Sequence, residues 1–423
     1  GDGFYVTSDY DRALDYYDQA IALEQRSQAD YVRYQKAIAL GLNQRVTDKI
    51  AQLEELARDY SHSRLMDAVE YELGRSYANT GRTEEAIRQF RKVIDKYDAN
   101  ENRYVHQSLA SLGRTYYNEN RSQDARETYD KMLELYSSYD KTKEAWAGLK
   151  QIYIDQNNVQ EWIVRAKASG YYNISVAAED SAYYIVAENA YFAEDYALAQ
   201  KSFDYYLEEY DQPLFALNAH FYRADCNFRN LKYAEALEDY AYVAEQPHNR
   251  FSERSLFRAG AIHYRNENWA KADEYYGQLA QVAESQEYLT EALVGRMRTT
   301  HRLKRPNEAL KLADKVLNEV ELEEAMFIEA HFVKGRAAFD LDDLDLAYQE
   351  LKITADTTNN VQGAEAKYHM ALIRFRQDDY PVAEQEVFEF VRDKKANGFW
   401  TAKSLILLAD VYTAIGDLFQ ARA

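Results

Sequence analysis

A small residue recurs along this chain at a spacing that a repeat architecture explains. We call these recurring positions marks. Neighbouring marks are 36 to 39 residues apart, and ten of the twelve are alanine. They are Ala13, Lys49, Ala86, Ala125, Trp162, Ala199, Ala236, Ala272, Ala309, Ala347, Ala383 and Ala421. Such a period predicts a row of similar supersecondary units, so the length of 423 residues does not by itself indicate two or three compact domains.

A second small residue lies twelve positions before most of these marks. The set is Ala37, Gly74, Gly113, Ala187, Ala224, Gly260, Gly335, Ala371 and Ala409, with Lys150 and Met297 as exceptions. Small side chains allow two helix axes to approach closely. Two such positions in every repeat therefore predict two close helix contacts per unit.

Aromatic residues surround the small positions, and tyrosine alone supplies 38 residues. Between His220 and Tyr240, Phe221 and Phe228 flank one small residue at helical spacing, and Tyr233 and Tyr240 flank another. The polar letters RNLK between these stripes predict a short turn. Each repeat is therefore predicted to be a helix hairpin whose aromatic stripes become buried when the next hairpin stacks on it.

Composition narrows the classes of function. Only four prolines and fifteen glycines interrupt a helix-favouring chain, whose formal net charge is −20. An acidic surface repels phosphate backbones and anionic lipids, so we expect neither nucleic-acid nor membrane binding. No apolar run approaches the length of a membrane span, and the first residues lack the pattern of a signal peptide.

No motif predicts catalysis, a cofactor or a metal site. The single cysteine, Cys226, has His220 six residues upstream, which a helix places on a different face. We therefore interpret Cys226 as a packing residue rather than a nucleophile. The histidines form no HExxH motif, and the chain has no GxxxxGK[ST], Rossmann glycine or GxSxG pattern. We expect no enzyme activity in these residues.

An arginine ladder is the candidate binding feature. The ladder consists of Arg229, Arg265, Arg302 and Arg376, and each directly follows the aromatic position of a first helix. Tyr264 fills that position before Arg265, and His301 fills it before Arg302. Asp340 interrupts the series. In an acidic chain, a recurrent cation could form a positive track for a carboxylate-bearing peptide. The alternative is that each arginine caps helix carbonyls and pairs with nearby acids.

The stretch YELGRSYANTGRTEEAIRQFRKVIDKY resembles the tetratricopeptide repeat family. Leu73, Gly74, Tyr77, Ala86 and Phe90 occupy the characteristic positions of that family. Its repeat is 34 residues long, and the units here are two to five residues longer. From Tyr191 onward the first-helix aromatic also lies one place later. The lysine and asparagine clamp of some members is not reproduced.

The resemblance implies an all-α, right-handed superhelical solenoid of about 11–12 stacked hairpins. It also implies a non-catalytic scaffold that binds a protein or peptide partner along a concave groove lined by first helices. The structural positions would be Gly74, Ala86, Gly113, Ala125, Ala199, Ala236, Ala272, Ala347 and Ala383. The alternative is a helical accessory region of a larger envelope enzyme of the lytic transglycosylase type. The tyrosine-rich repeats look like those of Gram-negative envelope proteins, which points to the periplasm or cell envelope, with the cytoplasm left open.

The repeat pattern changes around Trp162, where bulky residues replace the small ones. We predict sub-arrays at residues 1–166 and 183–423, joined by an irregular junction at 167–182. The alternative is a degenerate repeat that packs normally around a bulky tryptophan. Because the array opens inside a first helix, we also expect these residues to be part of a longer repeat protein.

Overall fold

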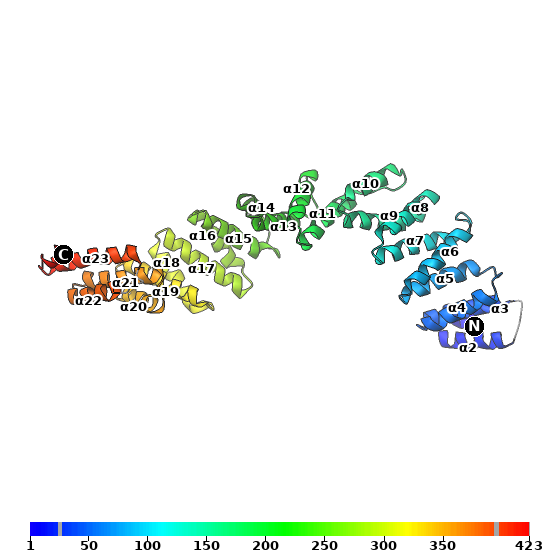
Figure 1. Ribbon diagram of the computed structural model, residues 1–423, viewed down its shortest axis with the longest axis horizontal. Helices are drawn as coiled ribbons and strands as arrows, with labels where there is room; N and C mark the ends of the chain where they lie inside the picture. Colours follow the sequence, from blue (N-terminus) through cyan, green and yellow to red (C-terminus); the bar gives the residue numbers. More distant parts are fainter. Residues whose placement is uncertain (24–27, 393–396, 423) are drawn as a thin grey trace. The chain divides into compact units, whose positions relative to one another are not determined.

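The computed structural model describes residues 1–23, 28–392 and 397–422. The described residues contain helices and no strand. They form two compact units, Gly1–Val186 and Ala187–Ala423, and the division falls inside one helix, α11. Within each unit, successive helices lie side by side as antiparallel hairpins (Figure 1).

In residues 1–23 and 28–186, the first unit contains ten helices and the beginning of an eleventh. They are α1 (Asp2–Val6), α2 (Tyr10–Ala22), α3 (Ala29–Leu42), α4 (Val46–Asp59), α5 (Met66–Asn79), α6 (Thr83–Lys96), α7 (Arg103–Asn118), α8 (Ser122–Leu135), α9 (Tyr139–Asp155), α10 (Val159–Ala168) and α11 (Val176–Phe192).

The second unit contains the end of α11 and all the helices that follow. They are α12 (Tyr196–Glu209), α13 (Ala216–Arg229), α14 (Tyr233–Glu245), α15 (Ser252–Arg265), α16 (Trp269–Val282), α17 (Gln286–Arg302), α18 (Pro306–Glu319), α19 (Glu324–Asp340), α20 (Leu344–Thr357), α21 (Val361–Arg376), α22 (Tyr380–Val391), α23 (Gly398–Ala414) and a 3₁₀ turn, η2 (Gln420–Arg422).

The two small positions of each repeat lie on the two helices of a hairpin. Marks from Ala13 to Ala383 fall on even-numbered helices, and the residues twelve places before a mark, from Ala37 to Ala409, fall on odd-numbered ones. The alanines listed as structural positions are completely buried, with an exposed fraction of 0%. The fold is therefore the predicted all-α stack of helix hairpins in each unit.

One residue in every hairpin turn adopts the left-handed backbone conformation. It always lies five positions before the mark, from Ser8 with φ 60° to Asp378 with φ 59°. Glycine, which favours this conformation, holds the slot at Gly81 and Gly416 only. At Leu231 the turn is closed by a hydrogen bond from the amide of Lys232 to the carbonyl of Asn227, 2.8 Å long. This bond is the 6→1 link that ends many helices.

Glycine on first helices makes room for the rings of second helices. A Cβ atom on Gly113 would lie 2.4 Å from the Tyr129 ring, and one on Gly148 would lie 2.3 Å from the same ring. In the second unit, Tyr276 is held in the same way between Gly260 and Gly295. Both units thus contain a packing layer in which a ring fills the space that two glycines leave.

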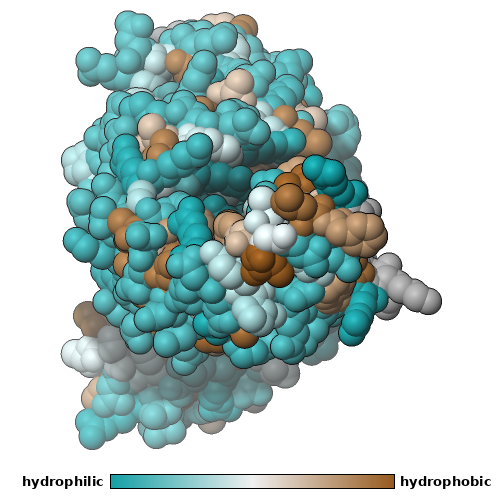
Figure 2. Space-filling model, turned by 90° about the vertical axis from the view of Figure 1, so that its left-hand side faces the viewer, coloured by the Kyte–Doolittle hydropathy of each residue, from teal (hydrophilic) through white to brown (hydrophobic). Residues whose placement is uncertain are grey.

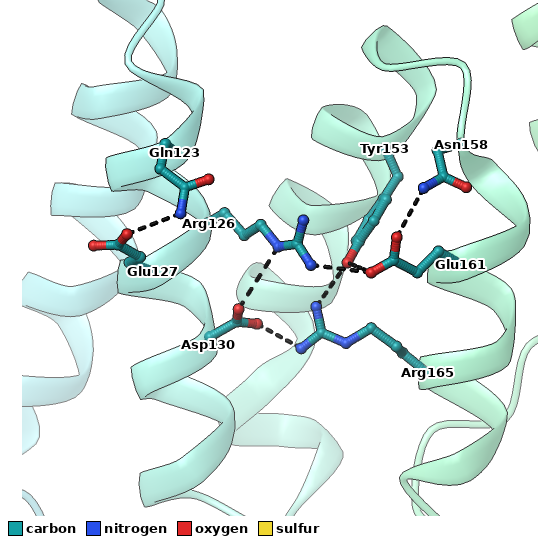
Figure 3. Close-up of polar contacts among 8 residues, drawn as sticks. All are labelled: Gln123, Arg126, Glu127, Asp130, Tyr153, Asn158, Glu161 and Arg165. Atoms are coloured by element: carbon teal, nitrogen blue, oxygen red, sulfur yellow. Dashed lines mark hydrogen bonds and ion pairs between the residues drawn. The ribbon is translucent and has the colours of Figure 1, made fainter.

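The repeat with the bulky mark also contains a pair of helices, α9 and α10. Trp162 is 1% exposed, and its indole N–H donates to the carbonyl of Trp146 over 3.2 Å. Figure 3 shows the polar contacts that join its helix, α10, to α8. Arg165 donates to Asp130 over 2.6 Å. α10 ends at Ala168 and α11 begins at Val176, so the stretch outside helices is narrower than 167–182.

The C-terminal end of the second unit exposes apolar side chains. Figure 2 faces this end and shows brown side chains gathered on a mostly teal surface. On and after α23, Phe399 is 63%, Ile406 is 64% and Phe419 is 82% exposed. None of the described helices combines the length and apolar character needed to cross a bilayer.

Candidate functional site

The arginines of the predicted ladder lie at or next to the C-terminal ends of first helices in the second unit. Each stacks over an aromatic ring. The distances from guanidinium carbon to ring centre are 4.7 Å for Arg229 over Tyr196, 4.2 Å for Arg265 over Tyr233, 5.9 Å for Arg302 over Trp269 and 4.4 Å for Arg376 over Phe339. These are cation–π contacts between one hairpin and the hairpin before it.

The ladder arginines differ in their carboxylate partners. Arg229 pairs with Asp225 at 2.7 Å, and Arg376 lies 3.7 Å from Asp342. In the part of the chain that the structure describes, Arg265 and Arg302 form no ion pair. Because stacking occupies the face of a guanidinium, its in-plane N–H groups stay available to an incoming carboxylate.

The two other residues named with the ladder are less accessible. Tyr264 is half-buried, with its ring centre 4.8 Å from that of Trp269. His301 is half-buried, with its ring 6.1 Å from that of Phe332. Burial, followed by the charge of Arg336, lowers the pKa of His301. His301 is therefore a neutral packing side chain at neutral pH.

Asp225 is the centre of a buried polar network. Its carboxylate is 1% exposed and accepts from Arg229 over 2.7 Å, from Arg254 over 2.6 Å and from the Tyr191 hydroxyl over 2.8 Å. Burial by itself would raise the pKa of Asp225, but the Arg229 hydrogen bond and the Arg254 charge outweigh it and lower the pKa. The network joins α11, α13 and α15.

Cys226 fills space next to this network. It is 0% exposed, and burial together with the Asp225 charge raises the pKa of its thiol to about 12. His220 instead bonds to Asp239, with 2.6 Å between its Nδ1 and the carboxylate. A buried thiol with a raised pKa is not a nucleophile at neutral pH, which agrees with the packing interpretation.

An aromatic cavity of about 350 Å³ opens beside Asp225. Its aromatic lining consists of Tyr191, Phe192, Phe221, Tyr222, Phe251 and Tyr288. The rings brace one another: the Phe221 and Phe251 centres are 4.1 Å apart, and those of Tyr191 and Tyr222 are 4.5 Å apart. Phe192 is 65% exposed, so the cavity has an aromatic rim that reaches solvent.

Arginines accompany the cavity on α15 and in the turn before it. Arg250 lines it and stacks over Phe251 at 4.5 Å. Arg254 also lines it and is paired with Asp225. Arg258, one turn further on, stacks over Phe228 at 4.2 Å. Within the described residues, neither Arg250 nor Arg258 forms an ion pair.

Sequence reasoning located the ladder but missed its partners, the Asp225 network and the cavity. For the ring partners, the sequence contained one signal. A ladder arginine follows Tyr196, Tyr233 and Trp269 after 32 or 33 residues in each case. The cavity gives no such signal, because Phe192, Tyr222 and Phe251 do not recur in each repeat.

Comparison with known proteins agrees with the repeat pattern. The family model described as tetratricopeptide repeat matches residues 71–160 and 187–250. A search of curated proteins gives no match.

Three solved structures match over most of the chain at low identity. The structure of Naa15/Naa10 bound to HypK-THB has 13% identity and a TM-score of 0.39, covering 99% of this chain and 73% of that one. The TPR domain of P58(IPK) has 13% identity and a TM-score of 0.27, with coverages of 96% and 99%. The APC/C hetero-tetramer Cut9-Hcn1 has 15% identity and a TM-score of 0.33, with coverages of 95% and 87%.

Proposed function

We propose that this chain, which carries tetratricopeptide repeats, is a non-catalytic scaffold that binds a protein or peptide partner along the first helices of its second unit. Stacked hairpins without a catalytic constellation are suited to present an extended binding surface. The partner would supply carboxylates to the arginine ladder.

The observation that carries this proposal is the state of Arg265 and Arg302. Both are exposed, both stack on a ring of the preceding hairpin, and both lack a carboxylate partner among the described residues. A stacked guanidinium has already lost much of its side-chain freedom, so binding a carboxylate costs it less entropy. Two such groups on successive first helices form a positive track on an acidic protein.

Reversal of these two charges tests the proposal. The chain and its R265E/R302E variant are immobilised and offered a lysate of the source cells, and the recovered partner is purified for a titration. We expect the variant to bind that partner at least about tenfold more weakly, because two charge-assisted hydrogen bonds become repulsive.

The matched control is K201E/K311E, which makes the same charge change on the second helices α12 and α18. Both lysines are exposed and lie two residues after a mark. Equal binding by R265E/R302E and the unchanged chain would overturn the proposal, as would a loss confined to the control.

The absence of catalysis and the envelope location are also proposals. Incubation of the chain with purified peptidoglycan should release no soluble fragments, and release would favour the transglycosylase-type alternative. The envelope location follows from the sequence resemblance, and fractionation of source cells followed by immunoblotting tests it. Recovery in the cytoplasmic fraction would contradict it.

A further inference from the structure

We infer that the aromatic cavity of α11, α13, α15 and α17 binds an extended peptide segment. The segment places one aromatic side chain in the cavity and side-chain carboxylates on Arg250 and Arg258. This inference rests on the proposed scaffold function and specifies the chemistry of its ligand.

The shape of the cavity favours a single aromatic side chain. At about 350 Å³ it lies near the low end of ligand pockets. The buried rings Phe221 at 3%, Tyr222 at 8% and Phe251 at 7% exposure brace one another, so the walls are formed before any ligand enters. A ligand ring would add edge-to-face contacts with these walls.

The charges favour acidic neighbours on the ligand. Arg250 and Arg258 lie on either side of Arg254, and their stacking over Phe251 and Phe228 fixes their guanidiniums. The Nε atom of Arg258 is buried without a hydrogen-bond partner among the described residues. Because Arg254 is already paired with Asp225, the two outer arginines are the groups that a ligand would satisfy.

The carboxylate that lines the cavity does not fill this role. Glu253 lines the cavity, but its Oε1 accepts from the backbone amide of Glu284 over 2.6 Å. Among the described residues, Glu253 forms no ion pair with Arg250 or Arg258.

The spacing of the arginines identifies the source of the carboxylates. Arg250 stacks over Phe251, whose ring lies against Phe221, and Arg258 stacks over Phe228. Phe221 and Phe228 are seven residues apart on α13, which is about two helical turns, so a single C-terminal carboxylate could satisfy only one of the two guanidiniums. Alternate side chains of an extended segment share one face and lie about 7 Å apart. In an internal acid–x–aromatic–x–acid segment, the aromatic side chain would enter the cavity, and the two carboxylates would reach Arg250 and Arg258.

The cavity and the ladder belong to one surface. Arg258 and Arg265 are seven residues apart on α15, which places them on the same face of that helix. A segment seated in the cavity could thus continue toward the ladder.

A random nonapeptide library displayed on phage provides the test. It is selected against the full chain and counter-selected on the R250E/R258E variant. Enriched peptides are synthesised with blocked termini and titrated by fluorescence polarisation. We expect the acid–x–aromatic–x–acid pattern, with binding weakened at least about tenfold by R250E/R258E and by replacing the peptide aromatic with alanine.

Phe192→Ala is the second variant, since a side chain that is 65% exposed can be removed with little effect on folding. It should weaken binding about threefold or more while the circular dichroism melt is unchanged. K201E/K311E should bind within about twofold of the unchanged chain, as expected for charges remote from a contact.

Three outcomes would overturn the inference: no enrichment over the counter-selection, enrichment of sequences without an aromatic or acids, or binding that requires a free C-terminus. If R265E/R302E abolishes partner recovery while any of these occurs, the scaffold function stands and the cavity assignment fails. If partner recovery is insensitive to R265E/R302E while the selected peptide behaves as expected, the ladder fails and the cavity stands.

Discussion

The two units use arginine and tyrosine in different ways. In the first unit, Arg82 stacks over Tyr77 at 4.3 Å and Arg121 over Tyr116 at 4.5 Å, so each contact lies inside one hairpin. In the second unit, the ladder stacks run from one hairpin to the previous one, as with Arg265 over Tyr233.

The two units carry the stacking arginine at different positions of the repeat: Arg82 and Arg121 lie four residues before a mark, and Arg265 and Arg302 lie seven residues before one. The residue before the second helix is Arg82 or Arg121 in the first unit, and the residue after it is the small Thr83 or Ser122. In the second unit, an aromatic such as Tyr233 begins the second helix, where the next hairpin can reach it.

This difference in position changes which groups the arginines contact. Arg121 of the first unit is paired with Asp124 at 2.7 Å. Arg265 and Arg302 of the second unit are held by rings and have no carboxylate partner among the described residues. Arg82 and Arg121 of the first unit thus contact rings of their own hairpins, whereas Arg265 and Arg302 of the second unit contact a ring of the preceding hairpin.

The largest expected effect is at Asp225, whose network is a feature of the second unit. Asp225→Ala removes the shared partner of Arg229 and Arg254 and should lower the free energy of unfolding of that unit by about 3 kcal/mol. Hydrogen exchange of the full chain checks this result: α13 and α15 should exchange faster, and α5 to α8 should be unchanged. Equal acceleration in both units would contradict the difference between them.

The pH dependence of stability sharpens this test. Because the folded pKa of Asp225 is lowered, its contribution is fully present above the unfolded pKa of about 3.9 and is lost as the pH falls through the folded pKa. Urea unfolding of the chain and of Asp225→Asn measures the difference between their free energies of unfolding. This difference should be constant from pH 7 to about pH 5 and should become smaller below about pH 4. A difference in free energy of unfolding that stays constant down to pH 3 would contradict the assignment of this pH dependence to Asp225.

The glycine layers should behave alike in both units. Gly113→Ala in the first unit and Gly295→Ala in the second each force a Cβ against a buried ring and should cost about 1–3 kcal/mol. Gly277→Ala is the control, since its Cβ would meet no atom closer than 3.7 Å, and it should stabilise α16 by about 0.5–1 kcal/mol. Thermal unfolding reports all three, and a cost in only one unit would show that the layer is not shared.

A double-mutant cycle measures the contact between hairpins. Replacing Arg265 and Tyr233 singly and together by alanine should give a coupling energy of about 0.5–1 kcal/mol. The cycle of Arg265 with Trp269 of its own hairpin should give a coupling near zero. A larger coupling energy for Arg265 with Trp269 than for Arg265 with Tyr233 would place the stack inside the hairpin, as in the first unit.

The smallest effect is expected at Cys226. Cys226→Ala should change the free energy of unfolding by about 1 kcal/mol or less and leave partner binding intact. The native thiol should resist a disulfide reagent until the chain unfolds, because its pKa is raised to about 12 by burial. Rapid modification of the native protein would contradict its packing role.

The periodic part of the fold was predictable because it depends on local spacing. Ala236 and Gly113 are read from intervals, and the structure places both at close helix contacts. The left-handed turn residues were not predicted, since side chains as different as Leu231 and Lys304 hold them.

The candidate site was only partly predictable. The position of Arg265 recurs, but its ring partner depends on how one hairpin stacks on the next. Asp225 occupies a slot that no neighbouring repeat fills with a buried acid, so a period gives no signal for it. Phe192 and Phe251 line the same cavity only through the tertiary packing of α11, α13 and α15.

Hydrogen exchange of the full chain with and without the partner recovered in the pull-down tests the central claim most directly. We predict slower exchange in α13, α15 and α17 on binding, and no such change in R265E/R302E at the same partner concentration. Protection confined to the first unit, or the same protection in R265E/R302E, would contradict the claim that the second unit carries the binding surface.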